Sequence, residues 1–77
     1  MKTLDSAQKG IALQIKHVRP HPNLLDCDQH LQQIGFIAGE QVTIRRPATS
    51  EQHPMVVRVG NSTFALRQEE AACIVVE

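Results

Sequence analysis

Residues 31–44 have the sequence "LQQIGFIAGEQVTI". It joins a run with helical spacing of apolar residues to a run that alternates like a β-strand, and it places Gly35 and Gly39 between them. Tight turns are usually polar, yet Phe36 and Ile37 are both apolar. The stretch therefore predicts a helix that ends at Gly35 and a turn whose apolar residues have a structural or binding role.

The two glycines are predicted to be structural turn residues. Gly35 stands where the helix must end, and the C′ position of a helix favours a left-handed residue. Gly39 is the third residue of the tetrapeptide 37–40, where a type II turn requires positive φ. An apolar contact commonly accompanies such a helix end, so Phe36 and Ile37 are expected to fold under the helix. No Lys-Ser or Lys-Thr pair follows the glycines, which argues against a phosphate-binding loop.

A short amphipathic helix is predicted before Gly35. Asn23 is expected to cap its start, with Asp26 three residues later as a weaker relative of the capping box. Apolar residues at positions i, i+3, i+7 and i+10 form one stripe, and these are Leu24, Cys27, Leu31 and Ile34.

Five short segments have the composition and alternation of β-strands, and they cover residues 11–18, 40–46, 55–59, 63–66 and 73–76. In the first strand Ile11, Leu13 and Ile15 are expected on one face. The segment 60–62 predicts a tight hairpin turn, and residues 67–72 predict a single helical turn. Residues 1–10 read as a polar lead-in. The chain is thus predicted to be one all-β domain over residues 1–77, a small β-barrel with one short α-helix inserted between the first and second strands.

Composition excludes several classes of protein. The 77 residues carry eight Lys plus Arg and eight Asp plus Glu, so the formal net charge is zero. Nucleic-acid binding usually requires a basic excess and aromatic stacking residues, and the chain has only Phe36 and Phe64 as aromatics. Arg45, Arg46 and Arg58 are close in sequence, but a solvated strand face is the simpler interpretation than a phosphate patch. We therefore expect no nucleic-acid partner.

The same composition indicates a cytoplasmic protein. The longest apolar runs are far too short to span a membrane, and the first ten residues lack the apolar core of a secretion signal. Two cysteines, Cys27 and Cys73, do not form a disulfide framework, so we expect reduced thiols.

Two segments resemble the FeoA family. Residues 31–39, "LQQIGFIAG", are similar to that family's L-x-x-L-G-[FLM]-x-P-G segment, and residues 64–71, "FALRQEEA", to its x-A-L-R-x-x-E-A segment. The resemblance covers residues 11–77. The family usually has proline where Ala38 stands, and the loop 47–54 departs from the family pattern.

The resemblance implies an SH3-like β-barrel and a cytoplasmic accessory role in bacterial ferrous iron uptake. The implied partner is FeoB, a membrane permease with a cytoplasmic GTPase domain. The candidate contact residues are Leu31, Phe36 and Ile37, which gather more apolar area than a small barrel requires. The alternative for these three residues is that all of them fill the core. An edge strand that pairs with a partner strand is a further possibility.

Metal binding and catalysis have little support in the sequence. Cys27 and His30 are the candidate metal ligands, for Fe²⁺ or Zn²⁺, because i and i+3 positions lie side by side on a helix. Cys27 also belongs to the apolar stripe, where a buried cysteine acts as a small hydrophobe, so no resident cofactor is expected.

No Ser-based triad is visible, and Glu69 and Glu70 read as solvated charges, which predicts a protein that is not an enzyme. The alternative function is a metal-responsive module similar to the C-terminal SH3-like domain of iron-dependent repressors.

Overall fold

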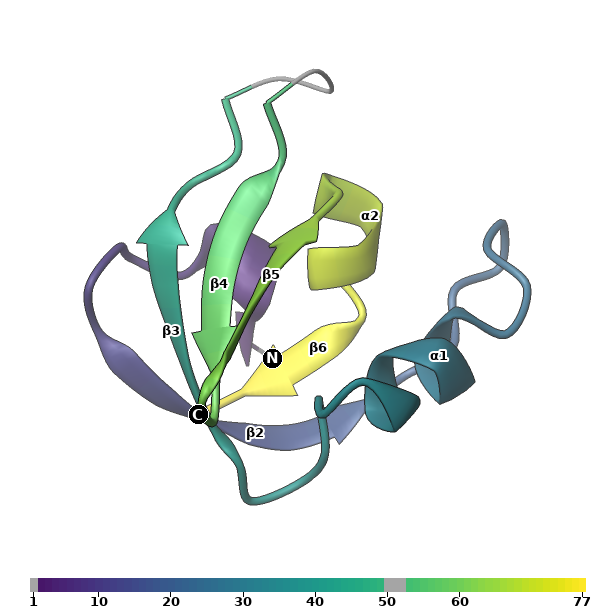
Figure 1. The fold of residues 1–77 in the computed structure, drawn as a ribbon. Coiled ribbons are helices and arrows are strands. Elements are labelled where there is room, and N and C mark those ends of the chain that lie inside the picture. The colour runs from purple at the N-terminus through teal and green to yellow at the C-terminus, as the bar shows by residue number, and fades with distance from the viewer. Residues whose placement is uncertain (1, 50–52) are drawn as a thin grey trace.

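The computed structural model describes residues 2–49 and 53–77. Within them, six strands form one antiparallel sheet in the order β1-β6-β2-β3-β4-β5. The strands are β1 Lys2–Thr3, β2 Ala12–Val18, β3 Gln41–Arg46, β4 Met55–Val59, β5 Ser62–Leu66 and β6 Ile74–Val76. The helices are the 3₁₀ turn Leu4–Ser6, α1 Cys27–Gln33 and α2 Gln68–Ala71. In Figure 1, β2 and β6 run across β3, β4 and β5, so the sheet curls around its core, and α1 lies at one side.

The N-terminal lead-in contributes to the fold, which its sequence did not indicate. Lys2 pairs with Val76 and Thr3 with Val75, and the following Leu4 is 0% exposed. This pairing joins the two ends of the chain, and local sequence patterns carry no signal for such a contact. Because β1 precedes it, the predicted first strand is β2, and α1 lies between β2 and β3. The segment 50–52 of the predicted loop 47–54 lies outside the described residues.

The predicted start of the helix is wrong. Helix α1 begins at Cys27, three residues later than the apolar stripe suggested, and Asn23 is not its cap. The backbone N–H of Asn23 instead donates to Nδ1 of His21, at 3.0 Å. Asp26 occupies the N-cap position with φ of 58°, and this left-handed backbone prevents the helix from extending further toward the N-terminus. Among the described residues, the Asp26 side chain makes no capping hydrogen bond.

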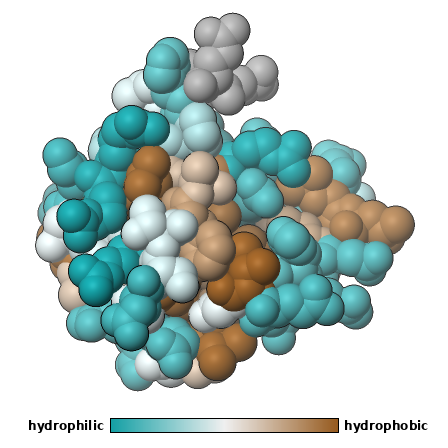
Figure 2. All heavy atoms as spheres, viewed as in Figure 1, coloured by the Kyte–Doolittle hydropathy of each residue, from teal (hydrophilic) through white to brown (hydrophobic). Residues whose placement is uncertain are grey.

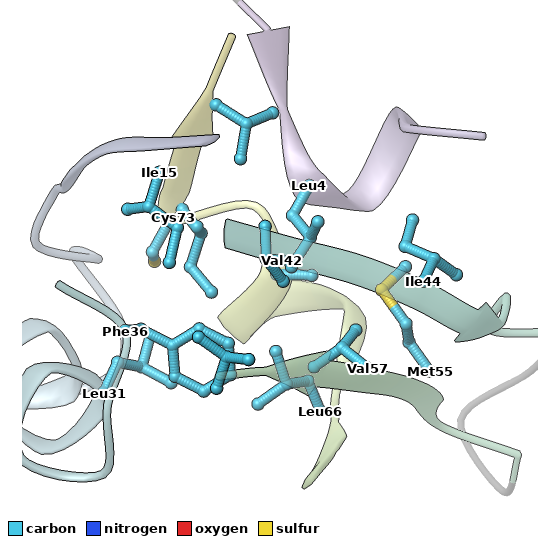
Figure 3. Packing of buried hydrophobic residues seen from close by; sticks show 14 of the residues in the cluster. Leu4, Ile15, Leu31, Phe36, Val42, Ile44, Met55, Val57, Leu66 and Cys73 are labelled. Carbon is cyan, nitrogen blue, oxygen red and sulfur yellow. The ribbon is translucent and has the colours of Figure 1, made fainter. Parts of the chain in front are cut away.

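The core takes its side chains from one face of the curled sheet and from α1. Alternation places Leu13 and Ile15 of β2 inside, as predicted, but Ile11 lies just before the strand and is 46% exposed. Figure 3 shows Leu31 and Phe36 among strand residues such as Val57 and Leu66. The hairpin between β4 and β5 turns through Gly60, whose φ is 57°. Leu31 and Phe36, at the end of α1, thus pack against the strands and complete the core on that side of the barrel.

Candidate functional site

The C-terminal end of α1 forms a Schellman motif. The N–H of Phe36 donates to the carbonyl of Leu31 at 2.9 Å, and the N–H of Gly35 donates to the carbonyl of Gln32 at 3.2 Å. Gly35, at C′, has φ of 123°. In this motif the residue after the glycine commonly packs on the residue three before the helix end, which here pairs Phe36 with Leu31. The apolar Phe36 is thus required by the way in which the helix ends.

The turn 37–40 follows at once and is fixed to the barrel. The N–H of Glu40 donates to the carbonyl of Ile37 at 3.1 Å, and Gly39, with φ of 93°, occupies the third position. Two further bonds join the turn to β2: Gly39 N–H to the Ile15 carbonyl, and Ile15 N–H to the Glu40 carbonyl, both at 2.8 Å. Because these three bonds pair four backbone groups of the turn, the turn has little freedom to move.

The three candidate contact residues do not share one environment. Leu31 and Phe36 are 0% exposed, and Phe36 also packs against Phe64 with ring centroids 5.6 Å apart. They fill the core, as the alternative interpretation proposed. Ile37, the next residue, is 46% exposed. Of the three, only Ile37 offers apolar surface to another molecule.

A second exposed apolar residue was missed by the sequence analysis. Leu25 is 93% exposed in the loop that leads into α1, directly before the N-cap residue Asp26. In Figure 2 apolar surface reaches the right edge of the view, where Figure 1 places α1 and that loop. The predicted helix, capped by Asn23, would have contained Leu25, so the sequence offered no reason to expect this exposure.

The two cysteines meet at the start of α1. Both are buried and reduced, and the Cys27 thiol donates a hydrogen bond to the Cys73 sulfur, while Cys73 donates to the carbonyl of Glu69 at 3.4 Å. Burial, and then the neighbouring Cys73, raise the pKa of the Cys27 thiol to about 11. Burial also raises the pKa of Cys73. Both residues are therefore neutral thiols at physiological pH.

The candidate metal ligands Cys27 and His30 lie near one another, but within residues 2–49 and 53–77 no third ligand completes a metal site with them. Cys27 and His30 line the same hollow, whose wall also includes Glu70. Across the described part of the chain, no group of three or more His, Cys, Asp or Glu side chains is arranged to hold a metal ion. A thiol must lose its proton to ligate a metal, and the raised pKa of Cys27 opposes this.

Of the two acidic residues after β5, Glu69 and Glu70, the second has a structural role. The Glu70 carboxylate accepts the backbone N–H of Arg67 at 2.8 Å, at the start of α2, and also accepts from the Arg67 guanidinium at 3.4 Å. This arrangement satisfies a backbone donor that the helix leaves unpaired.

No helix within residues 2–49 and 53–77 has the length and apolar character needed to cross a membrane.

Comparison with known families identifies a match over nearly the whole chain. The FeoA domain family matches residues 2–77. No curated protein matches the chain.

Solved structures agree with this match. The FeoA of Stenotrophomonas maltophilia, solved with zinc and described as a prokaryotic SH3 domain protein, is 30% identical with a TM-score of 0.85, over 100% of this chain and 91% of that one. Iron(II) transport protein A of Clostridium thermocellum is 29% identical with a TM-score of 0.78, over 99% of this chain and 44% of that one. FeoA of Chlorobium tepidum, at 20% identity and a TM-score of 0.79, shares the fold, with 97% of this chain and 68% of that one covered. The predicted SH3-like barrel and the predicted family resemblance are both confirmed.

Proposed function

The chain belongs to the FeoA family, which is linked to ferrous iron transport, and from this premise we propose that it is a cytoplasmic accessory protein that regulates iron uptake by binding a FeoB-like transporter. The proposal concerns the partner, its location and the contact surface. Its support is the family membership together with one feature of the surface, the exposed Ile37.

The exposed Ile37 is the observation on which the proposal depends. An isoleucine that is 46% exposed stands on a turn whose backbone is held by bonds to Gly35 and to β2. An apolar side chain on a fixed backbone loses less conformational entropy when a partner covers it than one on a mobile loop, so it contributes more to affinity.

Leu31 and Phe36 have a supporting role in this proposal. Both lie in the core beneath the turn, and through the Schellman bonds they set the direction in which the chain leaves the helix. They are not contact residues, and a substitution there would alter binding only through the position of Ile37.

The test is the affinity of the chain for the soluble GTPase domain of the FeoB from the same organism. Ile37→Asp should weaken binding by roughly tenfold or more, as loss of an interface anchor does. Ile11→Asp is the matched control, because Ile11 is also an isoleucine with 46% exposure. Unchanged affinity of Ile37→Asp, with the fold intact by circular dichroism, would contradict the proposal.

The second candidate function is a metal-binding module. The Stenotrophomonas maltophilia relative was solved with zinc, and here Cys27 and His30 would be the ligands. The neutral, hydrogen-bonded state of Cys27 is why this function ranks second. Calorimetry with Fe²⁺ and with Zn²⁺ tests it: heat that is lost in both Cys27→Ser and His30→Gln would favour it over the first.

A further inference from the structure

The outer face of β3 and β4 carries a polar hollow. Its volume is about 260 Å³, and its lining residues, which we call the arginine face, are Gln41, Thr43, Arg45, Arg58 and Gly60. The register of the two strands explains most of the grouping, because Thr43 lies opposite Arg58 and alternation places Gln41 on the same side as Thr43. Arg45 stands where the register shifts between Ile44 and Arg46, and it lines the same hollow. In Figure 2 the left of the view, where Figure 1 places β3, is mostly hydrophilic.

Both guanidinium groups of the arginine face lack a carboxylate partner among the described residues. Within these residues, the ion pair closer than 4.0 Å joins Arg67 and Glu70 at the start of α2. Arg58 is held in place by its Nε, which donates to the carbonyl of Gly60 at 3.3 Å. Its two terminal nitrogens carry N–H donors that are not used in that bond, and their planar fork matches the geometry of a carboxylate.

One acidic group stands at the edge of the hollow. A Cβ atom built on Gly60 would lie 3.8 Å from Oε2 of Glu40, so this carboxylate approaches the hairpin end of the arginine face. It forms no ion pair with Arg58 among the residues that the structure describes. The local balance is two positive charges against one negative charge, which leaves an excess that attracts anions.

We propose that the arginine face binds an acidic segment of a partner protein, through the Arg45 and Arg58 guanidinium groups, with Gln41 and Thr43 as neutral hydrogen-bond donors. The hollow is open to solvent, and its side chains Gln41, Arg45 and Arg58 are exposed, which suits an extended segment better than an enclosed small molecule. Neither aromatic residue lines the face, and the chain has no net positive charge, which disfavours a nucleic acid.

The arginine face is continuous with the turn that presents Ile37. Gln41, at the edge of the hollow, directly follows Glu40, the last residue of that turn. A partner that covers Ile37 would therefore place neighbouring residues within reach of the arginines. The proposal itself rests on the arginine face and does not require the proposed transporter.

The test is a titration of the ¹⁵N-labelled full chain with a blocked peptide of three consecutive glutamates, and with the same peptide carrying glutamines. The glutamate peptide should shift the amide signals of Thr43, Arg58 and Gly60. Arg45→Gln and Arg58→Gln should each weaken binding by about threefold to fivefold, the effect of one exposed charge pair. The glutamine peptide should cause no localised shifts.

Two further variants separate the face from general charge effects. Arg46→Gln removes the same charge from the same strand, but Arg46 does not line the hollow, so its affinity should stay within the error of the wild type. Glu40→Gln should tighten binding, because it removes the one carboxylate at the edge. Equal weakening by Arg46→Gln, or weaker binding by Glu40→Gln, would overturn the proposal.

The remaining outcomes also decide between partners. Absence of localised shifts with the glutamate peptide would overturn the proposal. Equal or stronger shifts of the same amides with inorganic phosphate or with a single-stranded DNA oligomer would overturn the choice of an acidic protein segment, and would assign the face to a phosphate-bearing ligand. None of these results depends on whether the FeoB GTPase domain binds at Ile37.

Discussion

The two ends of helix α1 are built by different means. At the C-terminal end, Gly35 and Phe36 complete a motif in which each backbone bond and one apolar contact follow from the local sequence. At the N-terminal end, Asp26 takes a left-handed conformation that is unusual for a residue other than glycine, and the loop before it leaves Leu25 almost fully exposed. The C-terminal end is specified by short-range rules, whereas at the N-terminal end the first helical residue, Cys27, is buried in the core of the barrel with Cys73.

At the C-terminal end of α1, the residue expected to affect stability and the residue proposed to affect binding are different. Phe36 and Ile37 are neighbours, but the motif buries the first and the fixed turn exposes the second. We infer that substitutions at the C-terminal end divide cleanly into those that unfold the chain and those that alter only its surface.

The largest expected effect is at Phe36. Phe36→Ala should lower the free energy of unfolding by about 3–5 kcal/mol, because it removes a fully buried ring and leaves a cavity beside Phe64. Urea unfolding followed by circular dichroism measures this. Ile37→Ala, one residue later, should change stability by no more than about 0.5 kcal/mol. Similar losses for the two variants would refute the division between buried and exposed neighbours.

The next effect is at Gly35. Gly35→Ala should cost about 1–3 kcal/mol of stability, since the added side chain is strained at positive φ. Crowding is not the cause, because a Cβ there would meet Val59 Cγ1 at an ordinary 3.8 Å. Gln33→Ala, an exposed change two residues earlier at the last position of α1, is the control and should be nearly neutral. A neutral Gly35→Ala would mean that the helix does not end as described.

The N-terminal end of α1 should respond to alkaline pH. The folded-state pKa of Cys27 is raised to about 11, so above the ordinary thiol pKa the unfolded chain loses this proton first. Stability due to the neutral thiol is therefore complete below about pH 9 and falls between about pH 9 and 11, by on the order of 1–2 kcal/mol.

Cys27→Ala tests this pH dependence. The variant should show a shallower loss of stability over the same pH range than the wild type, whatever its stability at neutral pH. Guanidinium unfolding at several pH values gives the two slopes. Parallel slopes would exclude Cys27 as the titrating group.

The smallest expected effect is at Asn23. Asn23→Ala should change stability by less than about 0.5 kcal/mol, because the bond of this residue to His21 uses the backbone N–H, which alanine retains. A true helix cap at this position would cost about 1 kcal/mol on the same substitution. A loss of that size in thermal unfolding would restore Asn23 as the cap and contradict the observed start of α1.

Much of the fold could be predicted because its signals are local. Alternating apolar residues located β2 to β6, and the positive-φ requirement of the turns accounts for Gly35 and Gly39. Strand β1 was not predictable, because two polar residues gain their pairing only from Val75 and Val76 at the other end of the chain. Sequence spacing also could not show that Asp26 would turn the chain away from a helix and expose Leu25.

The candidate site was only partly predictable. Apolar content singled out Leu31, Phe36 and Ile37 together, but which of them faces solvent depends on the direction of the chain after the helix. The arginine face required the pairing of β3 with β4, since Arg58 lies opposite Thr43 and lines one hollow with Arg45, which is 13 positions away in the sequence.

We propose above that the turn carrying Ile37 is a partner-binding surface. A ¹⁵N titration of the full chain with the soluble GTPase domain of its own organism's FeoB can show this residue by residue. We predict shifts centred on Ile37 to Glu40 in the wild type and in Ile11→Asp, and their loss in Ile37→Asp. Absence of shifts at high micromolar concentration, or shifts confined to the exposed edge of β5, would contradict the claim.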